Sequence, residues 1–291
     1  MKIKQYKSFF QEQLASLYDE IEVESFFYII LENKNNLKRI DLALNINLEF
    51  SEQDLSVWNE ILEKLKLEIP IQYILGTTSF YGLDFEVNEN VLIPRPETEE
   101  LVEWIIKENT NIESSKKLKI LDIGTGSGCI AISLAKNIPN SEVFALDVSI
   151  KALAITKKNA EINNVYIAII QKNIFETVSL SAVEGFINQK FDIIVSNPPY
   201  IRNLEKHEIR KNVLDNEPHL ALFVEDNDAL IFYKKIAELA KINLVENSQL
   251  YFEINQYLAK ETIELLENLG FKNIELRQDI YGNDRMIRLQ I

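Results

Sequence analysis

From residue 119 to residue 269 the sequence alternates short apolar segments with longer amphipathic ones, and this alternation constrains the fold more than any other feature. Short β-branched runs predict strands, and apolar residues at helical spacing predict the helices between them. Strands joined through helices run parallel, in a sheet covered on both faces. The expected strands are 119–123, 142–146, 166–171, 191–196 and 249–254, and the expected helices are 129–137, 150–162, 229–244 and 257–269.

Two further strand-like runs, 272–278 and 285–291, end the sequence and are separated only by a turn around Gly282. Because no helix fits between them, a parallel crossover is not possible and the two runs should pair antiparallel. We therefore expect an α/β fold, in which a doubly wound and mostly parallel sheet of seven strands ends in an antiparallel hairpin.

The first 76 residues are predicted to form a small helical bundle. Apolar residues recur at helical spacing in 3–17 and 23–31, and Ser51 with Asp54 resembles a capping box that opens a third helix. Residues 77–92 are rich in aromatic and β-branched residues and indicate a short hairpin. The expected organisation is a helical domain at 1–76, a linker hairpin at 77–92 and an α/β domain at 93–291.

Three of the eight glycines fall within five residues, at Gly124, Gly126 and Gly128, where the first strand of the expected sheet passes into a helix. Glycines there allow positive φ angles and let a ligand approach the backbone closely. Such ligands lie outside the carboxyl ends of the strands, and Asp147, at the end of the next strand, can accept both hydroxyl hydrogens of a ribose. The nicotinamide fingerprint G-x-G-x-x-G would place its third glycine where Cys129 stands, so this loop alone does not identify the ligand. A loop that only packs strand against helix is the alternative.

Asn197, Pro198, Pro199 and Tyr200 follow the expected strand 191–196, whose end should face the same crevice. The two prolines fix the backbone and remove two N–H donors, while their carbonyl groups can still accept hydrogen bonds. The Asn197 side-chain oxygen and the Pro198 carbonyl can together accept both hydrogens of an NH₂ group. A primary amide nitrogen is a poor nucleophile and gains positive charge as it attacks a methyl group, so two acceptors would both aim it and stabilise it. An ordinary Asn-Pro turn is the alternative.

Charge and cysteine content disfavour several classes of protein. A formal net charge of −14 disfavours a nucleic-acid substrate, because phosphate binding needs clustered Lys and Arg. A single cysteine, Cys129, suits a reducing compartment. No apolar run reaches the length of a membrane span, and the N-terminus lacks the apolar core of a secretory signal, so we expect a cytoplasmic protein. The only histidines, His207 and His219, have no neighbouring Cys or carboxylate spacing that indicates a metal site.

Several segments of the chain, together with the glycine loop and residues 197–200, resemble the HemK/PrmC family of release factor glutamine methyltransferases. This resemblance covers nearly the whole chain and implies the Rossmann-like fold of class I methyltransferases. It implies methyl transfer from S-adenosylmethionine to the side-chain amide nitrogen of the glutamine in the GGQ motif of class 1 peptide chain release factors, with S-adenosylhomocysteine as product and no metal. The further segments are 71–76, 92–99, 217–218, 221–222 and 282–285, of which Pro94-Arg95-Pro96 is the most specific.

The resemblance also implies a role for individual residues. It places the cofactor against the glycine loop, Asp147 and a stretch beside the adenine, where this chain has Asn173 in place of the family's usual aspartate. It places the substrate glutamine against residues 197–200, with Phe80 closing over it. The implied cofactor-binding residues are Gly124, Thr125, Gly126, Ser127, Gly128, Asp147, Asn173, Ile174 and Asn197. The implied substrate-binding residues are Asn197, Pro198, Pro199, Tyr200 and Phe80, and the implied catalytic residues are Asn197, Pro198 and Tyr200.

Two alternatives remain open from the residues themselves. A DNA adenine-N6 or cytosine-N4 methyltransferase could use the same acceptor pocket, although such an enzyme must also hold a duplex, and this chain is acidic without a separate basic domain. A non-catalytic nucleotide-binding module would use the glycine loop and leave residues 197–200 without a purpose. We expect release factors rather than nucleic acid or membrane as partners, and a monomer whose bundle at 1–76 docks on the factor.

Overall fold

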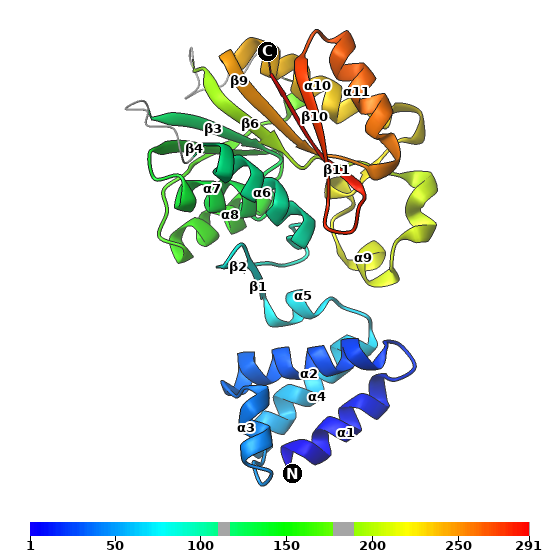
Figure 1. Cartoon of the computed structure of the whole chain (residues 1–291). Coiled ribbons are helices and arrows are strands. Elements are labelled where there is room, and N and C mark those ends of the chain that lie inside the picture. The colour runs from blue at the N-terminus through cyan, green and yellow to red at the C-terminus, as the bar shows by residue number, and fades with distance from the viewer. Residues whose placement is uncertain (110–116, 177–188, 291) are drawn as a thin grey trace. The chain divides into compact units, whose positions relative to one another are not determined.

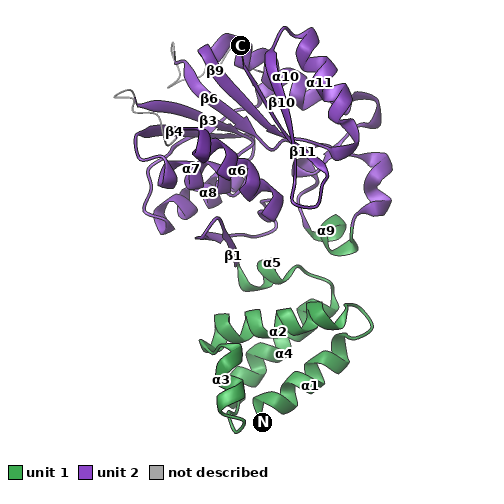
Figure 2. Cartoon of the chain, viewed as in Figure 1, with its two compact units in different colours: residues 1–76, 210–216 green, residues 77–209, 217–291 purple. Residues whose placement is uncertain are grey.

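The chain forms two compact units in a computed structural model, which describes residues 1–109, 117–176 and 189–290. Unit 1 comprises residues 1–76 together with 210–216, and unit 2 comprises 77–209 and 217–291 (Figure 2). The hairpin after residue 76 therefore belongs to unit 2. Residues 210–216, which the sequence pattern placed with the α/β domain, group with unit 1.

Unit 1 is a bundle of short helices around an aromatic core. Trp58 is fully buried at its centre and lies within 6 Å, centroid to centroid, of the rings of Tyr6, Phe10, Phe27 and Phe50. The helices are α1 (Ile3–Leu14), α2 (Glu20–Asn35), α3 (Arg39–Leu44), α4 (Glu52–Lys66), α5 (Ile71–Leu75) and, from the later segment, α9 (Lys211–Asn216) (Figure 1).

Local sequence signals account for some of these helices and not for others. The predicted capping box is confirmed, because the Asp54 N–H donates to Ser51 Oγ at 3.1 Å and the Ser51 N–H donates to the Asp54 carboxylate at 2.9 Å. The short helices α3, α5 and α9 were not predicted. Helix α9 is held in unit 1 by the Lys211–Glu68 ion pair at 2.7 Å and the Arg210–Glu22 ion pair at 3.1 Å.

Unit 2 is built on a seven-stranded sheet with the order β10-β11-β9-β6-β3-β4-β5 (Figure 1). Neighbours from β9 to β5 run parallel, and β11 pairs antiparallel with both β9 and β10. The predicted doubly wound sheet with an antiparallel end is therefore confirmed; residue 291 of the last expected strand lies outside the described residues. The strands are β3 (Leu118–Ile123), β4 (Ser141–Asp147), β5 (Ala168–Gln171), β6 (Phe191–Ser196), β9 (Leu244–Glu253), β10 (Lys272–Gln278) and β11 (Asp284–Gln290).

Alternate side chains of the central strands enter two different cores. On β4, Val143 and Ala145 pack on one side of the sheet, while Phe144 and Leu146 pack on the other. The first core is completed by α6 (Pro96–Asn109), α7 (Cys129–Asn137) and α8 (Ile150–Ile162), and the second by α10 (Ile231–Asn243) and α11 (Ala259–Asn268). Helices therefore cover both faces, and this leaves the carboxyl ends of the parallel strands as the place for a ligand.

Smaller elements lie between the strands and helices of unit 2. The hairpin pairs β1 (Thr77–Phe80) with β2 (Leu83–Glu86), and a short parallel pair joins β7 (Ile201–Arg202) to β8 (Phe223–Val224). The second pair was not predicted, and neither were the 3₁₀ segments around it. None of the helices in the described ranges has the length and apolar character to cross a bilayer.

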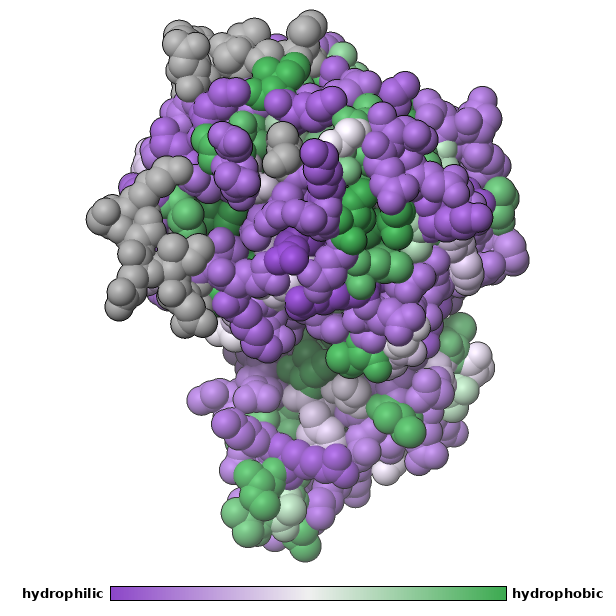
Figure 3. Space-filling model, turned by 45° about the horizontal axis from the view of Figure 1, so that its top comes forward, coloured by the Kyte–Doolittle hydropathy of each residue, from purple (hydrophilic) through white to green (hydrophobic). Residues whose placement is uncertain are grey.

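One face of the chain is mainly polar. On the face drawn in Figure 3, hydrophilic side chains dominate and hydrophobic ones form separate areas among them. Large apolar side chains are nevertheless exposed on unit 1, among them Ile21 at 83%, Leu44 at 80% and Leu67 at 72%.

Candidate active site

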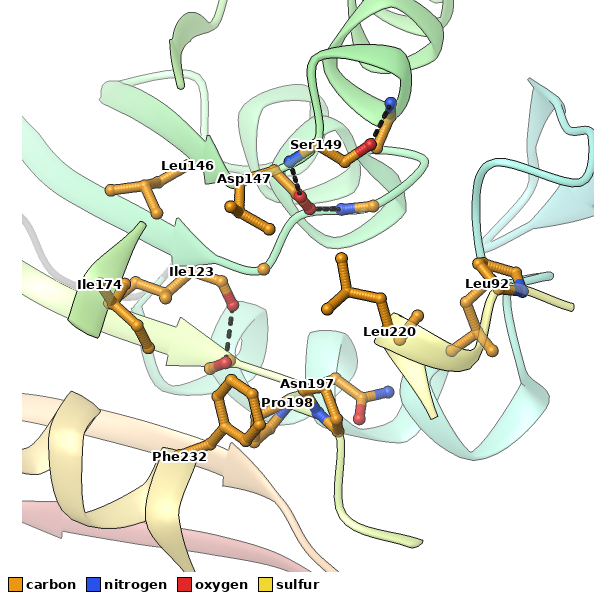
Figure 4. Close-up of a pocket in the computed structure, with 18 of the residues that line it drawn as sticks. Leu92, Ile123, Leu146, Asp147, Ser149, Ile174, Asn197, Pro198, Leu220 and Phe232 are labelled. Carbon is orange, nitrogen blue, oxygen red and sulfur yellow. Dashed lines mark hydrogen bonds between the residues drawn. The ribbon is translucent and has the colours of Figure 1, made fainter. Parts of the chain in front are cut away.

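A cavity of about 400 Å³ lies at the carboxyl ends of β3, β4 and β6. The last residues of these strands, Ile123, Asp147 and Ser196, all line it (Figure 4). The neighbouring strands are tied together at this edge, because the Ser196 hydroxyl donates to the Ile123 carbonyl at 2.6 Å. The volume falls within the usual range for small-molecule sites.

The glycine loop forms one wall of the cavity. Gly124 and Gly126 line it, with φ angles of +76° and +56°, and a Cβ added to either would meet no atom within 4 Å. Open space therefore lies beside this backbone, as a bound ligand requires. Gly128 serves a different purpose, because its Cβ would lie 2.8 Å from Thr156 Cγ2, so this glycine allows α7 and α8 to pack closely.

The Asp147 carboxylate is held at the cavity by two backbone donors. One oxygen accepts from the Gly126 N–H at 2.9 Å and the other accepts from the Ser149 N–H at 2.8 Å. Figure 4 draws both bonds at the cavity wall. A carboxylate oxygen has two acceptor sites, so each oxygen keeps one for a ribose hydroxyl. Burial raises the pKa of Asp147, and the backbone N–H donors oppose that shift.

A second carboxylate, Asp122, lies inside β3 below the loop and is completely buried. Its Oδ2 accepts from the Thr125 hydroxyl at 2.6 Å and from the Ala131 N–H at 3.3 Å, while its Oδ1 has no hydrogen-bond partner among the described residues. Burial raises the pKa of Asp122 to about 7. The Thr125 side chain is therefore turned toward the interior rather than toward the cavity.

Apolar side chains form the opposite wall, which suits a flat aromatic base. Ile174 follows β5, and Phe232 on α10 lies beside it in the cavity (Figure 4). Phe175 packs against Phe232 with the ring centroids 5.1 Å apart. Asn173 lines the same wall, with its side-chain oxygen accepting from the Phe175 N–H at 3.1 Å. Phe232 was missed by the sequence analysis, because an aromatic residue on an amphipathic helix gives no signal that distinguishes it from the core.

Asn197, Pro198 and Pro199 line the cavity at the end of β6. In Figure 4, Asn197 and Pro198 lie across the cavity from Asp147. The Asn197 Nδ2 donates to Thr98 Oγ1 at 3.2 Å, and the Asn197 Oδ1 has no partner among the described residues. Tyr200 is directed elsewhere, since its hydroxyl donates to Glu253 at 3.0 Å, and it does not line the cavity. Burial raises the pKa of Tyr200 well above its ordinary value.

The segments 92–97 and 217–222 meet at the same cavity. Glu217 is almost fully buried and accepts from Arg95 at 2.5 Å and from the Ile93 N–H at 3.2 Å. Leu92 from the first segment and Leu220 from the second line the cavity (Figure 4). Arg95, the central residue of the Pro94-Arg95-Pro96 stretch, therefore holds two wall segments together.

The structure brings most of the implied site residues together. Phe80 is different: it is 1% exposed, packs edge-on against Phe85 in the core and does not line the cavity, because β1 turns its side chain into the first core. The implied residues that line the cavity are Gly124, Gly126, Asp147, Asn173, Ile174, Asn197, Pro198 and Pro199, and those that do not are Thr125, Ser127, Gly128, Tyr200 and Phe80. Within the described ranges, no cluster of three or more His, Cys, Asp or Glu side chains is arranged to hold a metal ion.

Comparison with known proteins matches both units of the chain to described families. Residues 7–76 match the PrmC N-terminal domain, and residues 105–221 match the methyltransferase small domain. A methyltransferase crystal structure from Pyrococcus furiosus, 18% identical, aligns with a TM-score of 0.51 over 81% of this chain and 98% of its own, which shows a shared fold.

Sequence relatives extend over the full length. A release factor glutamine methyltransferase from Flavobacterium psychrophilum is 65% identical over 289 residues, covering 99% of both chains. Another protein with that name, from Bacteroides thetaiotaomicron, is 40% identical over 96% of this chain and 97% of its own. The chain belongs to the family of release factor glutamine methyltransferases.

Proposed function

We propose that this enzyme transfers a methyl group from S-adenosylmethionine to the side-chain amide nitrogen of a glutamine in peptide chain release factors, at the GGQ motif of class 1 factors. One observation carries the proposal: Asn197, whose side-chain oxygen has no partner among the described residues, and Pro198 line the same cavity as Gly124, Gly126 and Asp147. Acceptors for an NH₂ group thus stand across from a nucleoside-binding wall. The names of the full-length relatives supply the substrate.

The residues of the cavity fit the cofactor. Asp147 keeps an acceptor site on each oxygen for the ribose hydroxyls, Gly124 and Gly126 leave room for the methionine part, and Ile174 with Phe232 offers apolar surface to the adenine. When bound, S-adenosylmethionine supplies an electrophilic methyl group on a sulfonium centre. A tight site with apolar walls favours a transfer in which that positive charge disappears.

The acceptors at residues 197–198 act on the amide nitrogen. The Asn197 oxygen and the Pro198 carbonyl accept one hydrogen each, which orients the nitrogen toward the methyl group. As the new N–C bond forms and the S–C bond to the methyl group breaks, the nitrogen becomes more positive and both hydrogen bonds strengthen. The methylated nitrogen then releases one hydrogen as a proton to solvent. Their stabilisation is therefore greater in the transition state than in the bound substrate, as catalysis requires. Pro199 keeps this backbone rigid, since its ring fixes φ.

The two other readings of the sequence are less well supported. A DNA amino-methyltransferase could use the same acceptors, but the net charge of −14 opposes binding to a polyanion and the full-length relatives carry a protein substrate in their name. A nucleotide-binding module without activity does not account for the Asn197 oxygen, which no other described residue contacts by a hydrogen bond.

Unit 1 is proposed to dock on the release factor. It contains no part of the cavity lining, so its contribution to the reaction would be to hold the protein substrate rather than to bind the cofactor. A glutamine on a protein loop must be held in register with the methyl group, because small errors of position cost large factors in rate. Docking by unit 1 would provide that register.

The proposal is tested by incubating unmethylated release factor with enzyme and S-adenosylmethionine and measuring the factor's mass. We expect the factor to gain the mass of one methyl group on the GGQ glutamine, and DNA duplexes in a parallel reaction to gain none. Asn197→Ala should lower the methylation rate roughly a hundred- to a thousand-fold while cofactor affinity, measured by calorimetry, stays the same. Asn137→Ala on the last turn of α7 is the matched control and should keep full activity. A release factor that stays unmodified, or an Asn197→Ala enzyme with normal turnover, would overturn the proposal.

A further inference from the structure

Three side chains that are far apart in the sequence form a hydrogen-bonded chain behind the acceptor pocket. Glu253, at the end of β9, is 1% exposed and accepts from the Thr98 hydroxyl at 2.6 Å. Thr98, in the first turns of α6, is 3% exposed and accepts from Asn197 Nδ2 at 3.2 Å. Thr98 and Glu253 are 155 positions apart. Neither residue lines the cavity.

The number of available protons sets the direction of each bond. A threonine hydroxyl has a single hydrogen, and Thr98 gives it to the Glu253 carboxylate. Toward Asn197 the same oxygen can then only accept, so the Asn197 amide must present its NH₂ group to Thr98. The reverse orientation would bring two acceptor oxygens together. The Asn197 oxygen is consequently turned away from Thr98, and none of the described residues donates to it.

Two hydroxyl donors and a nearby cation support the carboxylate form of Glu253 that this direction requires, against burial, which raises its pKa. Its second oxygen accepts from the Tyr200 hydroxyl at 3.0 Å, so that each oxygen receives one hydroxyl proton. The positive charge of Arg285, itself paired with Asp279 at 3.2 Å, attracts the Glu253 carboxylate. Burial raises the pKa of Glu253, while Thr98, Arg285 and Tyr200 act in the opposite direction.

We propose that Thr98, held by Glu253, is a positioning residue that sets the Asn197 side-chain amide with its oxygen available to accept from the substrate NH₂ group. This inference rests on the proposed methyl transfer for its catalytic consequence. An Asn amide that could rotate freely would present its NH₂ group to the substrate NH₂ group for part of the time, donor against donor. The Thr98–Glu253 pair removes that orientation before the substrate binds, so no energy of binding is spent on it.

The test compares Thr98→Val, which keeps the shape and removes the hydroxyl, with Thr98→Ser, which keeps the hydroxyl. We expect Thr98→Val to lower kcat roughly ten- to a hundred-fold, the range found for orienting partners behind metal ligands, and to leave KM for release factor and the cofactor Kd unchanged. Thr98→Ser should restore most of kcat. Thr262→Val is the matched control, because Thr262 on α11 is also buried but donates to the carbonyl of Leu258, which precedes that helix. If the valine variant does not fold, Thr98→Ala removes the same hydroxyl without adding a methyl group beside Glu253.

A double mutant separates positioning from a general loss of structure. In the Asn197→Ala background, Thr98→Val should cause no further loss of kcat, because the amide that it orients is absent. An equal loss in both backgrounds, or a Thr98→Val enzyme with normal kcat, would overturn the proposal.

A spectroscopic measurement tests the orientation without relying on activity. The Asn197 side-chain NH₂ signal in a nitrogen-labelled enzyme, assigned by its loss in Asn197→Asp, should shift in Thr98→Val and stay nearly unchanged in Thr98→Ser. An unshifted signal in Thr98→Val would overturn the positioning role even if wild-type enzyme did not methylate release factor. Failure of the wild-type enzyme to methylate would by itself count only against the proposed function.

Discussion

Replacing Asp122 by Asn should change the pH dependence of stability in a defined direction. In the folded protein this carboxyl is completely buried, one of its oxygens has no partner among the described residues, and burial raises its pKa from 3.8 to about 7. The folded state therefore binds a proton that the unfolded state has released at intermediate pH. Stability from this group is fully present below about pH 4 and is lost as the pH rises toward 7.

The size of the effect follows from the shift. Each pKa unit corresponds to about 1.4 kcal/mol of stability. The rise from 3.8 to about 7 therefore corresponds to a decrease in the free energy of unfolding on the order of 4 kcal/mol between these two pH values. Between pH 5 and pH 8 the free energy of unfolding of the wild-type chain should fall by about 2–3 kcal/mol more than that of Asp122→Asn, because the amide does not titrate. The amide can still accept from Thr125 through its oxygen.

The assay is urea unfolding at several pH values between 5 and 8 without cofactor. The chain has two tryptophans, Trp58 in unit 1 and Trp104 in unit 2, so a Trp58→Phe background lets Trp104 fluorescence report unit 2 alone. Asp192→Asn on β6 is the control for the loss of one negative charge; its carboxylate is half-buried and accepts from the Lys119 N–H at 2.9 Å. The reasoning would be refuted if the free energy of unfolding changed with pH in the same way for the wild type and for Asp122→Asn. It would also be refuted if Asp192→Asn altered the pH dependence as much as Asp122→Asn does.

Three further changes test other parts of unit 2 and the role of unit 1. Asp147→Ala should weaken cofactor binding by roughly 1.5–3 kcal/mol, because charged acceptors for the ribose are lost, and calorimetry measures this directly. Gly128→Ala should destabilise the fold more than Gly270→Ala in thermal melts; both have positive φ, but only at Gly128 would the new Cβ lie within 3 Å of packed side chains. A chain beginning at Thr77 should bind cofactor normally and methylate intact release factor slowly, with little change for short glutamine peptides. Full-rate methylation of the intact factor by that chain would contradict docking by unit 1.

The fold could be predicted from the sequence because its determinants are local and periodic. The expected helices 129–137 and 150–162 match α7 and α8, and the expected strand 191–196 matches β6. The apolar runs that form strands, and the helical spacing of apolar residues between them, arise because both faces of the sheet are buried. The pattern can therefore be recognised in consecutive residues. The short elements between residues 197 and 230 lack such periodicity and were missed.

The positions of the glycine loop, Asp147 and residues 197–199 could also be predicted, because each follows a strand and parallel strands end at one edge of the sheet. The direction and contacts of the side chains at these strand ends could not be predicted. Thr125 and Tyr200 are turned toward buried carboxylates, and Phe80 lies in the core. Side-chain direction at the end of a strand depends on neighbours that the local pattern does not contain.

The sequence by itself determined the architecture and the edge of the sheet where the chemistry is placed. Only the tertiary structure decided how that site is supported: Glu217 joins two wall segments through Arg95, and Glu253 orients Asn197 through Thr98. Each of these contacts joins residues more than 90 positions apart, and two of them pair a buried carboxylate with a donor: Glu217 with Arg95, and Glu253 with Thr98. A buried charge must find partners wherever the folded chain brings them, so its contacts follow from the packing of distant elements rather than from any local signal.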